Sequence, residues 1–141
     1  MSGVAATLLM GETTHSALQL NKKSRMVDHE SVEKWVHTKL VIIDEISFAS
    51  INDIKKIYEN LCNLKQNLNE PFGGVHLIFS GDFRQLEPVG RGQSTIFSSE
   101  DSELENWINC YIELNGKHRF VSDPEWGQIL QRFRDGQVTL Q

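Results

Sequence analysis

The sequence has few of the features that mark membrane, secreted or zinc-binding proteins. Its longest wholly apolar run is the four residues 40–43, whereas a transmembrane helix needs ~20. Its two cysteines, Cys62 and Cys110, match neither a disulfide framework nor a paired-ligand zinc site. The first ten residues have no basic segment before an apolar stretch, as a secretory signal would. The sequence therefore predicts an intracellular protein without a membrane span.

No repeat, low-complexity tract or linker rich in proline, glycine and serine divides the 141 residues. This length is that of one domain, and a hydrophobic content of 39% is enough to form a core. We therefore expect one compact unit. The net charge of −5 means that the chain as a whole does not attract polyanions, so any contact with nucleic acid must be local.

Strand signals occur at three places along the chain. Residues 39–44 are short, β-branched and almost wholly apolar, which predicts a strand buried on both faces of a parallel sheet. Residues 75–80 predict a second strand and residues 110–114 a third. Helical segments alternate with these strands. The fold class that this alternation predicts is α/β, with a parallel sheet flanked by helices.

Helix signals are strongest in two segments. Ser50 is a candidate cap for a helix that continues to about residue 67, because its apolar residues recur at spacings of three and four. Asp123 or Ser122 caps a last helix, with Pro124 in its first turn and Gly136 beyond its end. Weaker expectations are short helices at 4–10, 14–20 and 101–107 and a polar loop at 22–29.

Polar side chains follow each predicted strand. The three sets are Asp44 and Glu45, then Asp82, Arg84 and Gln85, then Lys117, His118 and Arg119. In an open parallel sheet, ligands bind at the carboxyl ends of the strands. If the strands are parallel neighbours, the three sets face one cleft.

The residue types in the first two sets suit phosphoryl transfer. Of two adjacent acids, Asp44 and Glu45, one can hold a hard cation through oxygen while the other polarises a water molecule. Their side chains diverge along a strand, which does not suit sugar hydrolysis. The Gln85 amide can donate to a phosphate oxygen and accept from a water. The alternatives are an acidic pair that only ends a strand and an ordinary surface loop.

Several segments, in this order and spacing, resemble motifs of superfamily-one DNA helicases, and in particular the petite-integration-frequency (PIF) family. Residues 41–47 (VIIDEIS) resemble motif two, and residues 81–86 (GDFRQL) with Pro88 and Val89 resemble motif three, although Glu87 stands where the family usually has proline. The other matching segments are GVAA at 3–6 with Gly11, Thr13, His15 and Ser16 (motif Ia), PFGG at 71–74, and Leu114, Asn115, His118, Arg119 and Phe120 (motif four). The resemblance covers residues 1–141 as a partial helicase motor domain, from motif Ia through motif four and the following helix.

This resemblance implies a RecA-like P-loop NTPase fold and an ATP-dependent DNA helicase. Such an enzyme couples ATP hydrolysis to 5′-to-3′ translocation and duplex unwinding. The cofactors that it implies are ATP and Mg²⁺, and the partners are single-stranded DNA and DNA duplex junctions. In a eukaryotic source the protein would work in the nucleus, the mitochondrion or both. The pathway stays open among telomere maintenance, recombination, mitochondrial DNA upkeep and transposition.

The resemblance also implies a role for each matching residue at the nucleotide. Asp44 would hold the magnesium of an ATP complex, and Glu45 would activate the attacking water. Gln85 would sense the γ-phosphate, and Arg119 would be the arginine finger that neutralises charge developing during transfer. Asp82 would orient its loop.

Motif Ia contacts single-stranded DNA in the family. By the same resemblance, Thr13, His15 and Ser16 would contact the DNA backbone, and His15 could also stack on a base. A histidine with only a structural role beside a helix start is the alternative.

The phosphate-binding motif Gly-x-x-x-x-Gly-Lys-Ser/Thr is absent. The single Gly-Lys pair, Gly116-Lys117, has Tyr111 at the position of the first glycine and His118 in place of the serine or threonine. In the family, the P-loop lies just upstream of motif Ia, and a second RecA-like domain follows. We therefore expect a fragment without the P-loop strand and the second domain, which alone neither binds ATP tightly nor unwinds DNA.

Two other functional classes are compatible with these residues. The chain could be a catalytically dead helicase remnant, such as a transposon-derived piece, that acts at most as a binding module. It could also be another P-loop-related NTPase without a DNA role, although motifs Ia and four argue against this. Trp35, Trp107 and Trp126 are expected to be packing aromatics. Exposed leucine and isoleucine side chains predict aggregation of the chain alone.

Overall fold

The computed structural model describes residues 10–20, 27–85, 96, 106–115 and 118–137. The chain divides into two compact units, residues 1–107 and 108–141, where we expected one. The division falls at residues 108–115, which form neither helix nor strand and are exposed. The third strand predicted at 110–114 is therefore wrong. Among the described residues, no helix is long and apolar enough to cross a membrane.

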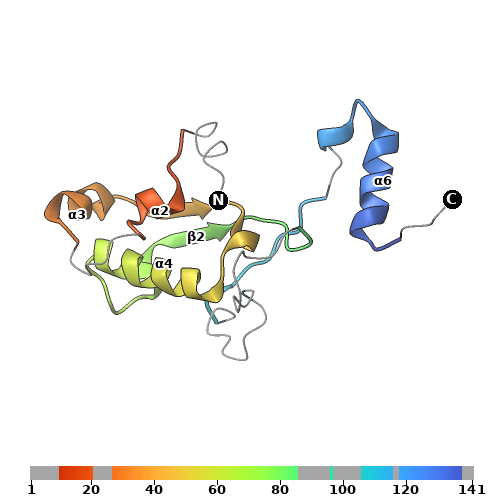
Figure 1. Ribbon diagram of the computed structural model, residues 1–141. Coiled ribbons are helices and arrows are strands. Elements are labelled where there is room, and N and C mark those ends of the chain that lie inside the picture. Colours follow the sequence, from red (N-terminus) through yellow and green to blue (C-terminus); the bar gives the residue numbers. More distant parts are fainter. Residues whose placement is uncertain (1–9, 21–26, 86–95, 97–105, 116–117, 138–141) are drawn as a thin grey trace. The chain divides into compact units, whose positions relative to one another are not determined.

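The first unit contains a parallel pair of strands (Figure 1). Strand β1 (Leu40–Ile43) pairs with β2 (His76–Phe79), with Leu40 opposite His76 and Ile43 opposite Phe79. Both strands were predicted within one or two residues, and their parallel direction is confirmed. The carboxyl ends of the two strands consequently lie side by side.

The strands are covered on one face in the described part of the chain, not on both as the sequence predicted. Ile43 is buried, whereas Leu40, Ile42 and Ile78 are 51%, 64% and 48% exposed. Alternate residues of a strand point to opposite faces. Apolar residues thus occupy both faces, but the helices described here pack against only one of them.

Helix α4 (Ile51–Leu64) provides most of the covering layer and runs alongside the strands (Figure 1). Ser50 caps it as predicted, with a reciprocal capping box. The Ser50 hydroxyl accepts from Asp53 N, and the Asp53 carboxylate accepts from Ser50 N at 3.0 Å. The buried residues of α4 are Ile54, Ile57, Leu61, Cys62 and Leu64. The helix ends earlier than expected, and Gln66 follows with a positive φ of 51°.

The 3₁₀ segment η2 (Pro71–Gly74) leads from α4 into β2 and anchors an aromatic cluster. Phe72 is buried and meets the rings of Tyr58 and Trp107 edge-on, at centroid distances of 5.2 and 5.1 Å. Trp107 stacks on Tyr58 at 5.0 Å. These contacts confirm Trp107 as a packing aromatic, and Trp35 is buried as well. Trp126 differs, because 49% of it is exposed.

Two short helices precede the sheet. Helix α2 (Thr14–Ala17) falls within a predicted helical segment, but α3 (His29–Val36) was not predicted. Asp28 begins α3, because its carboxylate accepts from Ser31 N at 2.9 Å. Lys65 caps the C-terminal end of α3. The Lys65 ammonium donates to the carbonyl oxygens of Trp35, Val36 and Thr38 at 2.9, 2.9 and 3.0 Å.

The second unit contains the 3₁₀ segment η3 (His118–Phe120) and helix α6 (Pro124–Arg134). Asp123 caps α6 and Gly136 follows it with a φ of 69°, both as predicted. Gly127 allows α6 to approach Phe120, since a Cβ at this position would lie 3.0 Å from the Phe120 Cβ. The helix predicted at 101–107 is described only at its last two residues, which are helical. The segment predicted at 4–10 lies outside the described residues except for residue 10, and the loop predicted at 22–29 is described only from residue 27.

Candidate functional site

The turn that follows β1 (residues 44–48, the β1 turn) carries the two predicted acids. Asp44 is exposed and Glu45 is half-buried. Glu45 has the left-handed backbone angles φ 56° and ψ 40°, and the 3₁₀ segment η1 (Ile46–Phe48) follows it. Non-glycine residues rarely adopt this conformation, and such strain is frequent at functional sites. This conformation occurs directly after Asp44.

The carboxylates of Asp44 and Glu45 are candidate ligands for a cation. Neither makes a hydrogen bond or an ion pair with another residue in the described ranges, and Glu45 does not cap η1. No cluster of three or more metal-ligating side chains occurs among the described residues. One or two carboxylates suit Mg²⁺, which is usually bound through one or two protein oxygens together with phosphates and waters. The donor set of the β1 turn therefore fits a magnesium–nucleotide complex.

The turn that follows β2 (residues 81–85, the β2 turn) is ordered by Asp82. The Asp82 carboxylate accepts from Arg84 N at 3.0 Å and from Gln85 Nε2 at 3.3 Å. Gln85 N also donates to the Asp82 carbonyl oxygen at 3.0 Å. Asp82 thus binds the amide nitrogen of the Gln85 side chain, which is exposed.

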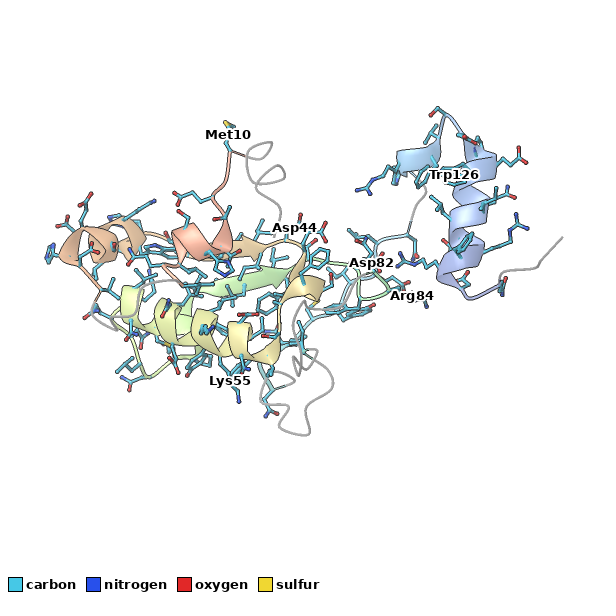
Figure 2. The ribbon with its side chains drawn as sticks, in the orientation of Figure 1. Met10, Asp44, Lys55, Asp82, Arg84 and Trp126 are labelled. Atoms are coloured by element: carbon cyan, nitrogen blue, oxygen red, sulfur yellow. The ribbon has the colours of Figure 1, made fainter. Side chains whose placement is uncertain are left out.

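The β1 and β2 turns are joined directly. Ser80 N donates to the Ile43 carbonyl at 2.9 Å, and Ile46 N donates to the Ser80 carbonyl at 2.9 Å. Gly81 lies against η1 so closely that a Cβ there would be 3.0 Å from Ile46 N. Figure 2 shows Asp44 and Asp82 at this end of the strands. The structure therefore brings together the first two of the three predicted polar sets.

The described residues of the third polar set belong to the second unit. Lys117 lies outside the described residues, and His118 and Arg119 are exposed in η3 of the second unit. Each unit is described by itself. The pairing of Arg119 with the β1 turn stays a prediction, and the strand that was expected to carry it is not formed.

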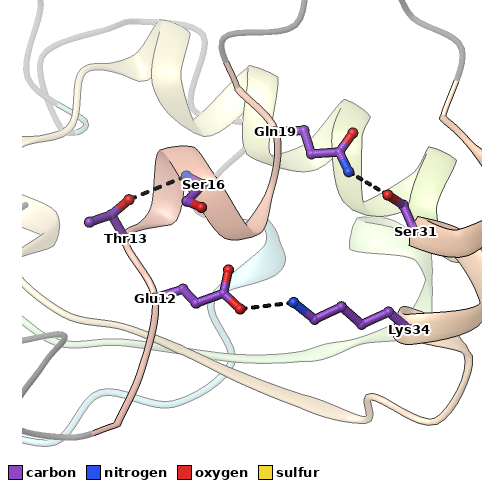
Figure 3. A network of polar contacts seen from close by, with 6 residues as sticks. All are labelled: Glu12, Thr13, Ser16, Gln19, Ser31 and Lys34. Atoms are coloured by element: carbon purple, nitrogen blue, oxygen red, sulfur yellow. Dashed lines mark hydrogen bonds and ion pairs between the residues drawn. The ribbon is translucent and has the colours of Figure 1, made fainter.

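The three residues predicted to contact DNA lie on and beside α2. Figure 3 draws two of them, Thr13 and Ser16. His15 and Ser16 are exposed, whereas Thr14 and Leu18 are buried. Thr13 is the N-cap of α2, and its hydroxyl accepts from Ser16 N at 3.3 Å. The helix therefore turns one side toward the core and presents the His15 and Ser16 side chains outward.

Sequence reasoning missed the residues that hold this segment. Figure 3 shows Lys34 of α3 bound to Glu12 at 2.8 Å and Gln19 bound to Ser31. A third bond comes from α4, where Asn60 Nδ2 donates to the Leu18 carbonyl at 2.7 Å. The partners are 12 to 42 positions apart in the chain. No local pattern of the sequence indicates contacts over such separations.

The α/β arrangement, the joined turns and the motif order define a RecA-like helicase piece. The family model of PIF1-like helicases matches residues 1–140. The chain belongs to this family. It is 31% identical to the ATP-dependent DNA helicase PIF1 of Candida albicans over 156 aligned positions, which include 97% of the chain.

Solved structures of Pif1 helicases have the same fold. The crystal structure of Pif1 helicase from Candida albicans matches 98% of the chain with a TM-score of 0.79 and 31% identity. That of Pif1 helicase from Bacteroides, in complex with ADP-AlF3 and single-stranded DNA, matches 98% with a TM-score of 0.74 and 27% identity. The chain spans 17% of the curated Candida relative and 33% and 36% of the two solved chains.

Proposed function

We propose that this chain is the part of an ATP-dependent DNA helicase that carries its hydrolytic carboxylates and part of its DNA-binding surface. The whole protein would couple ATP hydrolysis to 5′-to-3′ translocation and duplex unwinding. The observation that carries the proposal is the junction of the β1 and β2 turns. It unites two carboxylates that have no partner among the described residues with an exposed amide at the end of a parallel strand pair.

Asp44 and Glu45 would have different roles at the nucleotide. Magnesium bound with ATP supplies positive charge beside the transferring phosphoryl group. Asp44, exposed at the very end of β1, is the residue that would ligate it. Glu45 would accept the proton of the attacking water, a step that typically contributes ~100- to 10,000-fold to the rate.

Gln85 and Arg119 would respond to the γ-phosphate. The Gln85 amide can donate to a phosphate oxygen and accept from a water. Its bond to Asp82 links its position to the β2 turn and, through Ser80 and Ile46, to the β1 turn. Arg119 would supply the positive charge that stabilises the transition state.

Single-stranded DNA and duplex junctions would be the partners. Since the net charge of the chain is −5, attraction to DNA must come from a local surface. The exposed side chains of His15 and Ser16 offer such a surface, together with Thr13. His15 can stack on a base while hydroxyl groups donate to phosphate oxygens.

The proposal is tested by Glu45→Gln in the full-length protein. We expect ATP turnover with single-stranded DNA present to fall about 100- to 10,000-fold, while nucleotide binding persists. Glu59→Gln is the matched control, because Glu59 is exposed on α4 and makes no ion pair with the described residues. Turnover that survives Glu45→Gln contradicts the assignment. A full-length wild-type protein without turnover favours the alternative, a noncatalytic helicase remnant that acts as a binding module.

The isolated 141-residue chain is expected to be inactive. Its sequence contains no Gly-x-x-x-x-Gly-Lys-Ser/Thr to cradle the phosphates. ATP turnover by the chain alone that disappears in Glu45→Gln would refute this expectation.

A further inference from the structure

Helix α2 is too short to hold its own conformation. It has four residues, and helices of this length are not stable in water without tertiary contacts. Just after it, Gln19 adopts a φ of 53°. This left-handed conformation is unfavourable for residues other than glycine. Contacts from the neighbouring helices must therefore fix the segment that carries Thr13, His15 and Ser16.

One of these contacts comes from the C-terminal half of α4. Asn60 is half-buried, and its Nδ2 donates to the Leu18 carbonyl at 2.7 Å. Leu18 is the C-cap of α2, and its side chain is only 2% exposed. The bond thus holds the backbone at the end of α2 where the Leu18 side chain enters the core.

A second feature concerns the start of α4. Burial raises the pKa of Asp53 there, but the hydrogen bonds from Ser50 and the charge of Lys56 bring this pKa below its ordinary value. The Asp53 carboxylate thus keeps the capping box with Ser50 that begins the helix. The same α4 begins just beyond the β1 turn.

We propose that Asn60 is a positioning residue for single-stranded DNA. Its side-chain amide fixes α2 on α4, so that Thr13, His15 and Ser16 meet the DNA together. This inference rests on the proposed DNA contact of these three residues. Asn60 itself points into the protein at Leu18 and acts through α2.

The test uses Asn60→Asp in the full-length protein. Aspartate has nearly the same shape but cannot donate to the Leu18 carbonyl when ionised. We expect the Kd for a fluorescently labelled oligothymidylate, measured by anisotropy at fixed salt, to rise about three- to tenfold. Asn63→Asp is the matched control. It adds the same charge to the same helix, and the Asn63 side chain has no hydrogen bond to the described residues.

Folding is measured separately, by thermal unfolding and by hydrogen exchange. We expect exchange to increase at residues 13–20 in Asn60→Asp while α4 keeps its protection, a pattern that general destabilisation would not give. If Asn60→Asp does not fold, Ser31→Ala takes its place. It removes the Gln19 contact of the same segment, and we expect a twofold or larger rise in Kd.

The outcomes separate this inference from the proposed function. A combined Thr13→Val, His15→Ala and Ser16→Ala variant tests the DNA contact itself. If this variant binds the oligonucleotide like the wild type, the proposed contact fails, and the inference fails with it. If the variant binds more weakly but Asn60→Asp binds like Asn63→Asp, only the inference is overturned. Equal loss of protection throughout α2 and α4 also overturns it, because Asn60 is then only a stabilising residue.

Discussion

Gly81 is the position at which the two turns of the candidate site can be separated by a single methyl group. A Cβ at Gly81 would lie 3.0 Å from Ile46 N, 3.1 Å from Ile46 Cγ2 and 3.1 Å from Ser47 N. Two of these neighbours are backbone atoms, which cannot move aside as a flexible side chain can. The φ angle of Gly81 is not in the left-handed region, so alanine is disfavoured by the lack of space alone.

We expect Gly81→Ala to push the β1 and β2 turns apart by a few tenths of an ångström. Overpacking of this kind costs ~1–3 kcal/mol, and the hydrogen bond from Ile46 N to the Ser80 carbonyl, now 2.9 Å, lengthens. Because a misplacement of 1 Å can lower turnover by ~100-fold, the smaller displacement predicts roughly a tenfold loss. The acids of the β1 turn and the amide of Gln85 no longer keep their spacing.

Two measurements check this prediction. Urea unfolding of the chain gives the change in stability, and ATP turnover of the full-length protein gives the change in activity. Ser80→Ala is the control, because it introduces alanine at the neighbouring exposed position without adding a Cβ to a crowded site. If Gly81→Ala matches Ser80→Ala in both measurements, the close approach of the two turns contributes neither to stability nor to ATP turnover.

Three further predictions concern stability and association. Lys65→Met removes an ammonium that donates to three carbonyls at the end of α3, so we expect a loss of about 2 kcal/mol in urea unfolding. Lys55→Met (Figure 2), an exposed control on the same helix, should change stability by less than ~0.5 kcal/mol; equal effects would contradict the role of Lys65. Gln66→Gly relieves a positive φ after α4 and should stabilise by about 0.5 kcal/mol, whereas destabilisation would show that the glutamine contacts matter more. The combined Ile42→Thr and Ile78→Thr variant should reduce self-association in sedimentation velocity, and a monomeric wild type at the same concentration would refute this.

The elements with strong local signals were predictable from the sequence. The two strands are short apolar runs that end at polar residues, and α4 has a cap, an apolar stripe and no internal glycine or proline. Helix α6 was located by Asp123 and Gly136 at its two ends. Each of these signals acts over one or two turns of chain, so the structure follows it closely.

The elements that depend on distant contacts were not predictable in the same way. Helix α3 lacks a long apolar stripe, and its C-terminal end is closed by Lys65, which lies about 30 positions away. Residues 110–114 have a strand-like composition but pair with no described strand. The exposed face with Leu40 and Ile42 illustrates the same limit, because apolar composition does not reveal which face a neighbouring element covers.

In the candidate site too, the residue types were predictable but the contacts that position them were not. The motifs predicted roles for Asp44, Glu45 and Gln85, but not the bonds that bring the two turns together. Those bonds are made by backbone groups of Ile43, Ile46 and Ser80, whose side chains carry no chemical signal. Asn60 is a similar case, since an asparagine on a helix is unremarkable until its amide is seen to hold a carbonyl 42 positions away. The candidate reacting groups are thus indicated by residue type, whereas their spacing depends on close packing and backbone bonds. A substitution at Gly81 probes this spacing, and one at Asn60 probes the placement of α2, without removing a candidate reacting group.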